Sequence, residues 1–166
     1  NLPWVTSCTE LYKKTKDVSI VASNKKVFPG QVLRHEFVEK HKDSELDVFG
    51  SITGTRLGSD LFDKIEGYRD YRFTIVIENC QHDNYFTEKI TDAFATGTIP
   101  VYWGTSNIGD YFNTDGIIEL TDEFDINILT PELYEEKFDA VKDNFERVNS
   151  LKMADDELYE NIQTYR

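Results

Sequence analysis

The chain has 166 residues, which is the length of one domain and is enough to bury a hydrophobic core. Its formal net charge of −13 argues against binding to nucleic acid or to an acidic membrane surface, because both are negatively charged. No stretch approaches the roughly 20 apolar residues that span a bilayer, and no signal-peptide pattern opens the chain. We therefore expect a soluble chain with no membrane segment. A cytoplasmic origin is a separate expectation, which the lack of a membrane segment does not decide.

Position 1 is Asn and the only methionine is Met153, so we expect this chain to be part of a longer or processed protein. Its two cysteines, Cys8 and Cys80, cannot define a disulfide framework, and their spacing fits no metal motif. We expect both to be reduced, unpaired thiols.

Stretches of strand length alternate with stretches of helical periodicity through the first two thirds of the chain. This alternation predicts an α/β fold, a Rossmann-like parallel sheet with helices on both faces. A stretch rich in glycine and hydroxyl residues at 50–59 indicates a loop after a strand end. In chain order, the expected elements are strands at 18–22 and 47–49 around a helix at 31–41, a helix at 61–68, strands at 73–77 and 99–102 around a helix that begins after Thr87, a short helix at 108–112, and a strand at 117–120.

The C-terminal part has helical periodicity. Pro131 directly follows Thr130, which is a favourable helix start, and five apolar residues then repeat at spacings of four, three, four and three. The pattern predicts one amphipathic helix, and a second helix is expected from Asp155. We assign 1–126 to the Rossmann-like domain and 127–166 to a helical extension that packs on it; packing toward a separate N-terminal domain is the alternative. The five apolar residues that repeat along the first of these two predicted helices are Tyr134, Phe138, Val141, Phe145 and Val148.

The run from 71 to 104 indicates one βαβ unit with polar side chains at its turn. The segment 73–77 has the apolar composition of a strand buried on both faces, Thr87 is a suitable helix N-cap, and Gly97 is a suitable stop. The loop 78–86 is therefore expected at the carboxyl end of a strand, where open α/β sheets bind ligands.

The helix that follows this loop suits an anionic ligand. Its N-terminus presents unpaired N–H groups and the positive end of a dipole, and Lys89 adds a full charge in the first turn. Glu88 lies opposite Ile90, so it is expected to point away from the core and to accept hydrogen bonds from ligand hydroxyls. A phosphate beside a sugar would satisfy both charged residues, and a solvated surface pair is the alternative. Asp92 is expected to face solvent.

A family resemblance rests on the string ENCQHDNYFTEKITDAF, followed by IPVYWG, which resembles the donor-binding signature of the α1,3-fucosyltransferases. That signature has an aromatic-Glu-Asn start, a Tyr-x-Thr-Glu-Lys core and a Pro-Val/Ile-Tyr-x-Gly end. Upstream, DVSIVASNKKVFPGQVLRHEFVEKH is similar to the family's strand ending in Ser-Asn and its following helix with an arginine, and DVFG resembles the next strand end. The resemblance covers about 13–113, and its main departure is Ile77, where many members have Phe.

The resemblance implies a GT-B type fold of two facing Rossmann-like domains, and this chain is similar to the C-terminal, GDP-fucose-binding half. It implies inverting transfer of L-fucose from GDP-fucose to a glycan hydroxyl. No metal cofactor is required if cationic side chains and backbone dipoles neutralise the diphosphate, and the sequence has no Asp-x-Asp triplet. The catalytic general base is expected in an N-terminal acceptor-binding domain outside this chain, so the chain alone is expected to bind the donor but to transfer poorly.

The resemblance also implies roles for individual residues. Arg34 is similar in position to the arginine that pairs with the donor phosphates, although alone it would be an ordinary surface arginine. Asn79 would reach a phosphate or cap a turn, and Tyr85 would contact the nucleoside. Ser23 and Asn24 would contribute at the first strand end or form only a turn. The complete predicted donor-binding set is Ser23, Asn24, Arg34, Asn79, Tyr85, Glu88 and Lys89.

Two other functions stay open at this point. The chain could belong to a transferase that uses a different nucleotide sugar, because the motif does not define the pocket at the sugar end. It could also be a noncatalytic nucleotide-sugar-binding module whose partner chain carries out the chemistry, or carries out none. A donor screen tests the first alternative, and donor binding without turnover in the complete protein would favour the second.

Overall fold

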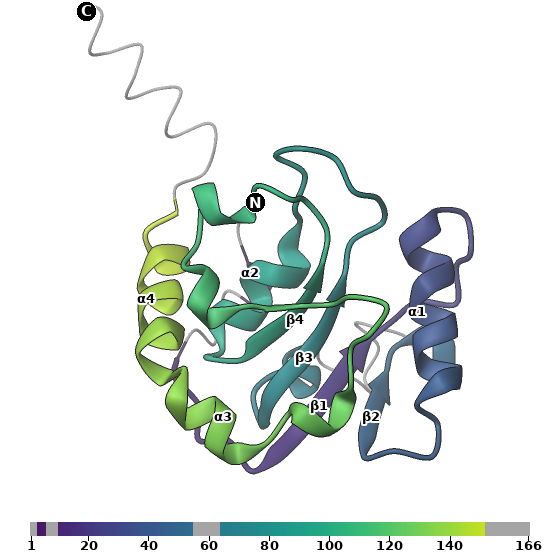
Figure 1. The fold of residues 1–166 in the computed structure, drawn as a ribbon, viewed down its shortest axis with the longest axis horizontal. Coiled ribbons are helices and arrows are strands. Elements are labelled where there is room, and N and C mark those ends of the chain that lie inside the picture. Colours follow the sequence, from purple (N-terminus) through teal and green to yellow (C-terminus); the bar gives the residue numbers. More distant parts are fainter. Residues whose placement is uncertain (1–2, 6–9, 55–63, 152–166) are drawn as a thin grey trace, which may run out of the picture.

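The computed structural model describes residues 3–5, 10–54 and 64–151 (Figure 1). In these residues, five parallel strands form one sheet in the order β2-β1-β3-β4-β5. The predicted α/β fold with a Rossmann-like parallel sheet is confirmed. The strands are β1 (Lys16–Val21), β2 (Leu46–Phe49), β3 (Tyr71–Ile77), β4 (Ile99–Trp103) and β5 (Ile118–Glu119).

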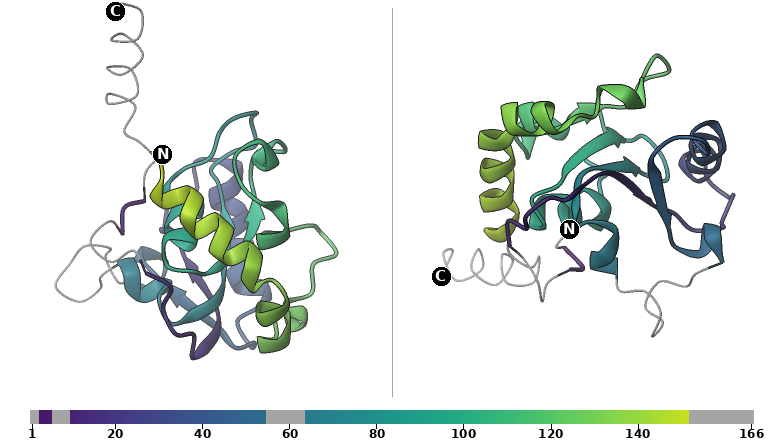
Figure 2. Two further views of the ribbon diagram at one scale, coloured as in Figure 1. Left: turned by 90° about the vertical axis from the view of Figure 1, so that its left-hand side faces the viewer. Right: turned by 90° about the horizontal axis from the view of Figure 1, so that it is seen from below.

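Helices cover both faces of the sheet, as the two views of Figure 2 show. α1 and α3 pack on one face, and α2 packs on the other. α4 lies against α2 and runs past the sheet edge. Its Val141 packs into the hydrophobic core on the α1 and α3 face, and its Val148 packs into the core on the α2 face. The helices are α1 (Pro29–Lys40), α2 (Glu88–Ala95), α3 (Pro131–Glu136) and α4 (Phe138–Asn149).

The central strand β3 supplies side chains to both cores. Phe73, Ile75 and Ile77 pack into the core shared with α1 and α3, whereas Val76 packs into the core shared with α2. Each of these side chains is at most 3% exposed. After Thr74 the strand sequence is apolar without alternation, because helices cover both of its faces.

The local signals around α2 are confirmed. Thr87 is the N-cap, and its hydroxyl accepts the Lys89 backbone N–H at 3.5 Å. Gly97 follows the C-cap with a φ of 68°, a left-handed conformation that favours glycine, and its N–H donates to the Phe94 carbonyl at 3.0 Å. The helix therefore begins and ends where these residues indicate.

In the described residues, the stretch from Pro131 to Val148, predicted as one helix, forms two helices with the break at Lys137. The break lets Tyr134 on α3 pack edge-on against Phe73 and donate its hydroxyl to the Gly97 carbonyl at 2.8 Å. After the break, α4 follows a different surface and buries Val148 near α2. One straight helix would have to give up one of these two contacts.

Several other predictions fall partly or wholly outside the described residues. The helix predicted at 61–68 is a 3-10 helix at Lys64–Gly67, and 61–63 lie outside the described residues. The loop predicted at 50–59 contains a 3-10 turn at Ser51–Thr53, and 55–59 lie outside them. Cys8 and the helix predicted from Asp155 also lie outside them.

The segment after residue 126 packs on the sheet, since Leu129 and Tyr134 share the core of β1, β3 and β4. A domain boundary at 126 stays a prediction. In the part of the chain that the structure describes, no helix combines the length and apolar character needed to cross a membrane.

Asp92 does not face solvent, contrary to the prediction. Its side chain is 0% exposed, and its Oδ1 accepts the backbone N–H groups of Trp4 at 2.6 Å and Val5 at 3.2 Å. Lys64 forms an ion pair with Oδ2. Burial raises the pKa of Asp92, and Lys64 opposes that rise. The prediction was wrong because the N-terminal segment, which is distant in sequence, covers this side of α2.

Gly30 allows α1 to approach the end of β3 closely. Its N–H donates to the Asn79 carbonyl at 3.0 Å. A Cβ atom at this position would lie 1.7 Å from the Glu78 carbonyl oxygen. Any side chain would therefore push the start of α1 away from the strand end.

We predict that Gly30→Ala lowers the free energy of unfolding by about 1–3 kcal/mol, because the added methyl group overlaps a backbone carbonyl. Gly109→Ala is the control, since its Cβ would meet only the Thr114 methyl carbon at 3.1 Å and should cost less. Urea denaturation followed by circular dichroism measures both variants. Equal stability of the two would contradict the close approach at Gly30.

Candidate functional site

The predicted residues lie at or near the carboxyl ends of β1 and β3, which are neighbours in the sheet. The chain leaves β1 for α1 on one face and leaves β3 for α2 on the other. Connections that diverge in this way create a switch point, and sheets with this strand order bind ligands there. The starts of α1 and α2 therefore flank the candidate site.

Arg34 reaches this edge from α1 and is only 5% exposed. Its Nε donates to the Ile77 carbonyl at 2.9 Å, and its Nη2 donates to Asn79 Oδ1 at 2.8 Å. Burial lowers the pKa of the guanidinium, and the nearby carboxylates of Glu78 and Glu88 oppose that effect. Because an arginine side chain stays charged in proteins, these contacts fix a permanent cation at the strand end.

Glu78 was not predicted from the sequence, yet it organises the start of α2. Its carboxylate is 0% exposed and accepts the Thr87 N–H at 2.8 Å, the Thr87 hydroxyl at 2.8 Å and the Lys89 ammonium at 3.1 Å. The buried charge is therefore both paired and hydrogen-bonded, as burial of a carboxylate requires. The sequence did contain a signal, because a charged residue directly follows an apolar strand.

Lys89 and Glu88 are partly buried and are not a solvated surface pair. Their side chains are 20% and 19% exposed. Glu88 lies 3.9 Å from the Lys89 ammonium and 3.7 Å from the Lys64 ammonium, so it has two cationic neighbours rather than pointing freely into solvent. Both distances exceed hydrogen-bond range, which leaves the carboxylate able to accept hydrogen bonds from a ligand.

Tyr85 lies on a loop that a pair of amides holds in place. The Asn84 N–H donates to Asn107 Oδ1 at 2.9 Å, and Asn107 Nδ2 donates to Asn84 Oδ1 at 2.8 Å. Asn84 has a φ of 62°, a conformation that asparagine tolerates better than most residues. Tyr85 is half-buried, and burial raises the pKa of its hydroxyl. The loop is thereby fastened to the segment that follows β4.

Ser23 and Asn24 follow β1 at the same sheet edge but do not join the other predicted residues. Asn24 is exposed, and its N–H donates to Ser51 Oγ at 3.0 Å. Within residues 3–5, 10–54 and 64–151, no group of three or more His, Cys, Asp or Glu side chains is arranged to hold a metal ion. The five predicted residues that gather around Glu78 are Arg34, Asn79, Tyr85, Glu88 and Lys89.

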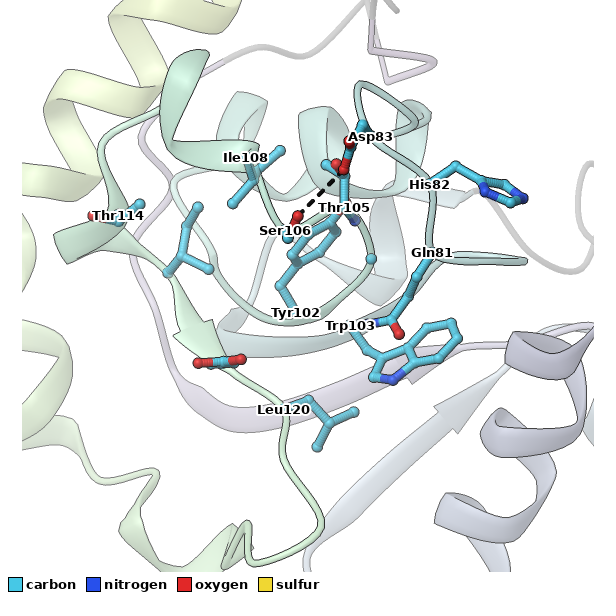
Figure 3. Close-up of a pocket in the computed structure, with 13 residues that line it drawn as sticks. Gln81, His82, Asp83, Tyr102, Trp103, Thr105, Ser106, Ile108, Thr114 and Leu120 are labelled. Atoms are coloured by element: carbon cyan, nitrogen blue, oxygen red, sulfur yellow. Dashed lines mark hydrogen bonds between the residues drawn. The ribbon is translucent and has the colours of Figure 1, made fainter.

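A cavity of about 510 Å³ opens beside this cluster, at the carboxyl ends of β4 and β5 (Figure 3). Trp103 forms part of its wall, and Ser106 Oγ donates to Asp83 Oδ1 across two loops at 3.4 Å. The cavity is lined by none of the seven residues predicted to bind the donor. The sequence did not predict this cavity, because the residues that line it come from three separate strand ends.

Residues 11–159 match the sequence profile of the C-terminal region of glycosyltransferase family 10 (fucosyltransferase). The chain belongs to this family. The suspected relationship to the fucosyltransferases is therefore confirmed, and the match extends well beyond the 13–113 region that the motifs covered.

Two relatives of this family 10 chain show how much of a longer protein it matches. An α-(1,3)-fucosyltransferase of Helicobacter pylori is 34% identical over 104 residues, which cover 63% of this chain and 21% of that protein. An α-(1,4)-fucosyltransferase of Arabidopsis thaliana is 37% identical over 49 residues, which cover 30% of this chain and 12% of that protein.

Solved structures agree with the family assignment. A crystal structure of an α1,3-fucosyltransferase with GDP superimposes with a TM-score of 0.55 and 29% identity, covering 80% of this chain and 38% of that one. A crystal structure with GDP-fucose gives a TM-score of 0.53 and 28% identity, covering 86% and 41%. This family 10 chain thus spans less than half the length of the relatives and structures it matches.

We predict that Glu78→Gln lowers the free energy of unfolding by about 1–3 kcal/mol, because it leaves the Lys89 ammonium without its buried counter-charge. Glu88→Gln is the matched control and should cost less than about 1 kcal/mol, since its ion pairs are long and partly solvated. Chemical denaturation of both variants makes the comparison. A larger loss for Glu88→Gln would contradict the central role of Glu78.

Proposed function

We propose that this family 10 chain is the donor-binding domain of a fucosyltransferase that transfers L-fucose from GDP-fucose, with inversion, to a hydroxyl of a glycan acceptor. The observation that carries the proposal is a pair of cations held at one sheet edge, Arg34 from α1 and Lys89 from α2. The related structures with GDP and GDP-fucose support the choice of nucleotide.

These two cations suit a diphosphate. In the described part of the chain, Arg34 donates through Nε and Nη2, so its Nη1 group is available to a ligand. Lys89 donates to Glu78 and Thr87, which leaves one ammonium N–H. Together with the first-turn N–H groups of α2 other than that of Lys89, which donates to Thr87, these donors would bind the phosphate oxygens.

The same donors would promote the reaction. As the glycosidic bond breaks, negative charge grows on the diphosphate leaving group. Donors that protein contacts already hold in place stabilise this charge without reorganising, which lowers the barrier to transfer. Arg34 is buried, so water screens its interaction with the leaving group less than it would for a surface arginine.

Inversion requires the acceptor oxygen to attack the anomeric carbon from the face opposite the diphosphate while a base removes the acceptor proton. We assign that base to a carboxylate in an N-terminal, acceptor-binding part of the full-length protein. Glu88 would accept hydrogen bonds from donor hydroxyls, and Tyr85 would pack against the nucleoside. The scheme uses no metal ion, because side chains and the α2 N-terminus supply the positive charge.

We predict that this chain binds GDP and GDP-fucose more tightly than UDP-glucose in isothermal titration calorimetry. Arg34→Lys should weaken GDP binding about 10- to 100-fold, because lysine keeps the charge but loses the planar fork. Lys89→Gln should weaken it by a similar factor. Lys142→Gln, on α4 and 46% exposed, is the control and should leave the affinity unchanged. A preference for UDP-glucose would overturn the proposed donor.

We predict that GDP binds equally well in EDTA and in Mg²⁺, since Arg34 and Lys89 neutralise the diphosphate in this scheme. Titrations of the same protein batch in the two buffers measure the difference. A loss of about tenfold or more on chelation, restored by added Mg²⁺, would show that a metal ion shares this task.

A further inference from the structure

The cavity beside the cationic cluster has walls from three neighbouring strand ends. Gln81 and Asp83 follow β3, Trp103 ends β4, and Glu119 and Leu120 lie at the end of β5. Figure 3 draws Gln81 and Trp103 among the residues that line it. Its volume of about 510 Å³ is in the range of small-molecule sites.

This cavity shares a wall with the proposed donor site. The Trp103 carbonyl accepts the Glu78 N–H at 2.8 Å, and a Cβ atom at Gly30 would lie 3.1 Å from the Trp103 ring. The indole is therefore packed against the start of α1 and also lines the cavity. Gln81 lies two residues after Asn79, so one loop serves both regions.

The loops that form the cavity are fastened together before any ligand binds. The reciprocal amide bonds between Asn84 and Asn107 join the loop after β3 to the loop after β4. Thr105 Oγ1 donates to Asn107 Oδ1 at 2.6 Å, and Tyr111 donates its hydroxyl to Asn84 Oδ1 at 2.7 Å. The cavity is thus preformed, which reduces the entropic cost of filling it.

The chemistry of the lining disfavours a phosphate and suits a neutral sugar. Among the described residues that line the cavity, the ionisable side chains are the carboxylates of Asp83 and Glu119 and the imidazole of His82, and no lysine or arginine is present. An anion would be repelled, whereas hydroxyl groups donate readily to carboxylates. The indole of Trp103 offers a flat apolar surface for the face of a pyranose ring.

We propose that this cavity is a subsite for a neutral sugar ring of the acceptor glycan, so that the donor-binding domain itself contacts the acceptor. The inference rests on the proposed function. The ring is assigned to the acceptor because Glu88 and Tyr85, which contact the donor in the proposed function, do not line the cavity. Asp83 and Glu119 accept the hydroxyls of this ring, and Trp103 packs against its apolar face.

The test uses this chain saturated with GDP and carrying Trp4→Phe, so that Trp103 is the remaining tryptophan. Fluorescence titration with lactose and with N-acetyllactosamine should change the Trp103 emission in the millimolar range. Asp83→Asn and Glu119→Gln should each weaken this binding about three- to tenfold while leaving GDP affinity unchanged. Glu146→Gln, which exchanges an exposed carboxylate on α4, is the matched control and should have no effect.

The outcomes separate this inference from the proposed function. GDP binding with no response of Trp103 to either disaccharide, or with a response insensitive to both substitutions, would overturn the acceptor subsite and leave the donor site intact. If Asp83→Asn and Glu119→Gln instead weaken GDP-fucose but not GDP, the cavity holds the donor fucose and the acceptor assignment is wrong. The chain could also bind the disaccharides, with weaker binding in both variants, but fail to bind GDP. That result would support the sugar subsite and overturn the proposed function.

Discussion

A buried carboxylate at the end of the central strand is the interaction on which the candidate site depends. Glu78 follows β3 directly, and its carboxylate accepts hydrogen bonds from the Thr87 N–H, the Thr87 hydroxyl and the Lys89 ammonium. A charge buried at this position would be costly without such partners. The end of β3, the N-cap of α2 and the cation in its first turn therefore form one unit, and removing one member takes a partner from each of the other two.

The strand order explains why two cations meet at this unit. β1 and β3 are neighbours, but the chain leaves them for opposite faces of the sheet. Arg34 arrives from α1 and Lys89 from α2, and both are held by groups at the end of β3. Gly30 makes this possible on the α1 side, since a larger residue would overlap the Glu78 carbonyl. A switch point of this kind gathers residues that are distant in sequence without any special loop.

Charge is divided along the carboxyl edge of the sheet. Arg34 and Lys89 bring two cations to the ends of β1 and β3, where the carboxylates of Glu78 and Glu88 lie beside them, although the whole chain carries −13. Asp83 and Glu119 make the neighbouring cavity acidic, and Trp103 borders both regions. Net charge therefore describes the surface of this protein and not its site. The division matches the proposed pair of ligands, an anionic nucleotide beside a neutral sugar.

Signals that act over a few residues were sufficient for the central βαβ unit: the N-cap at Thr87 and the apolar run of β3 can be recognised without the fold. The contiguous family signature likewise named most of the residues that gather at the sheet edge. Only the tertiary structure decided their partners, the break between α3 and α4, and the cavity. Arg34 donates a hydrogen bond to a carbonyl 43 positions away in the sequence, and Asp92 accepts one from a backbone N–H 88 positions away. Such contacts depend on which surfaces the folded chain brings together, so the periodicity within one helix does not predict them.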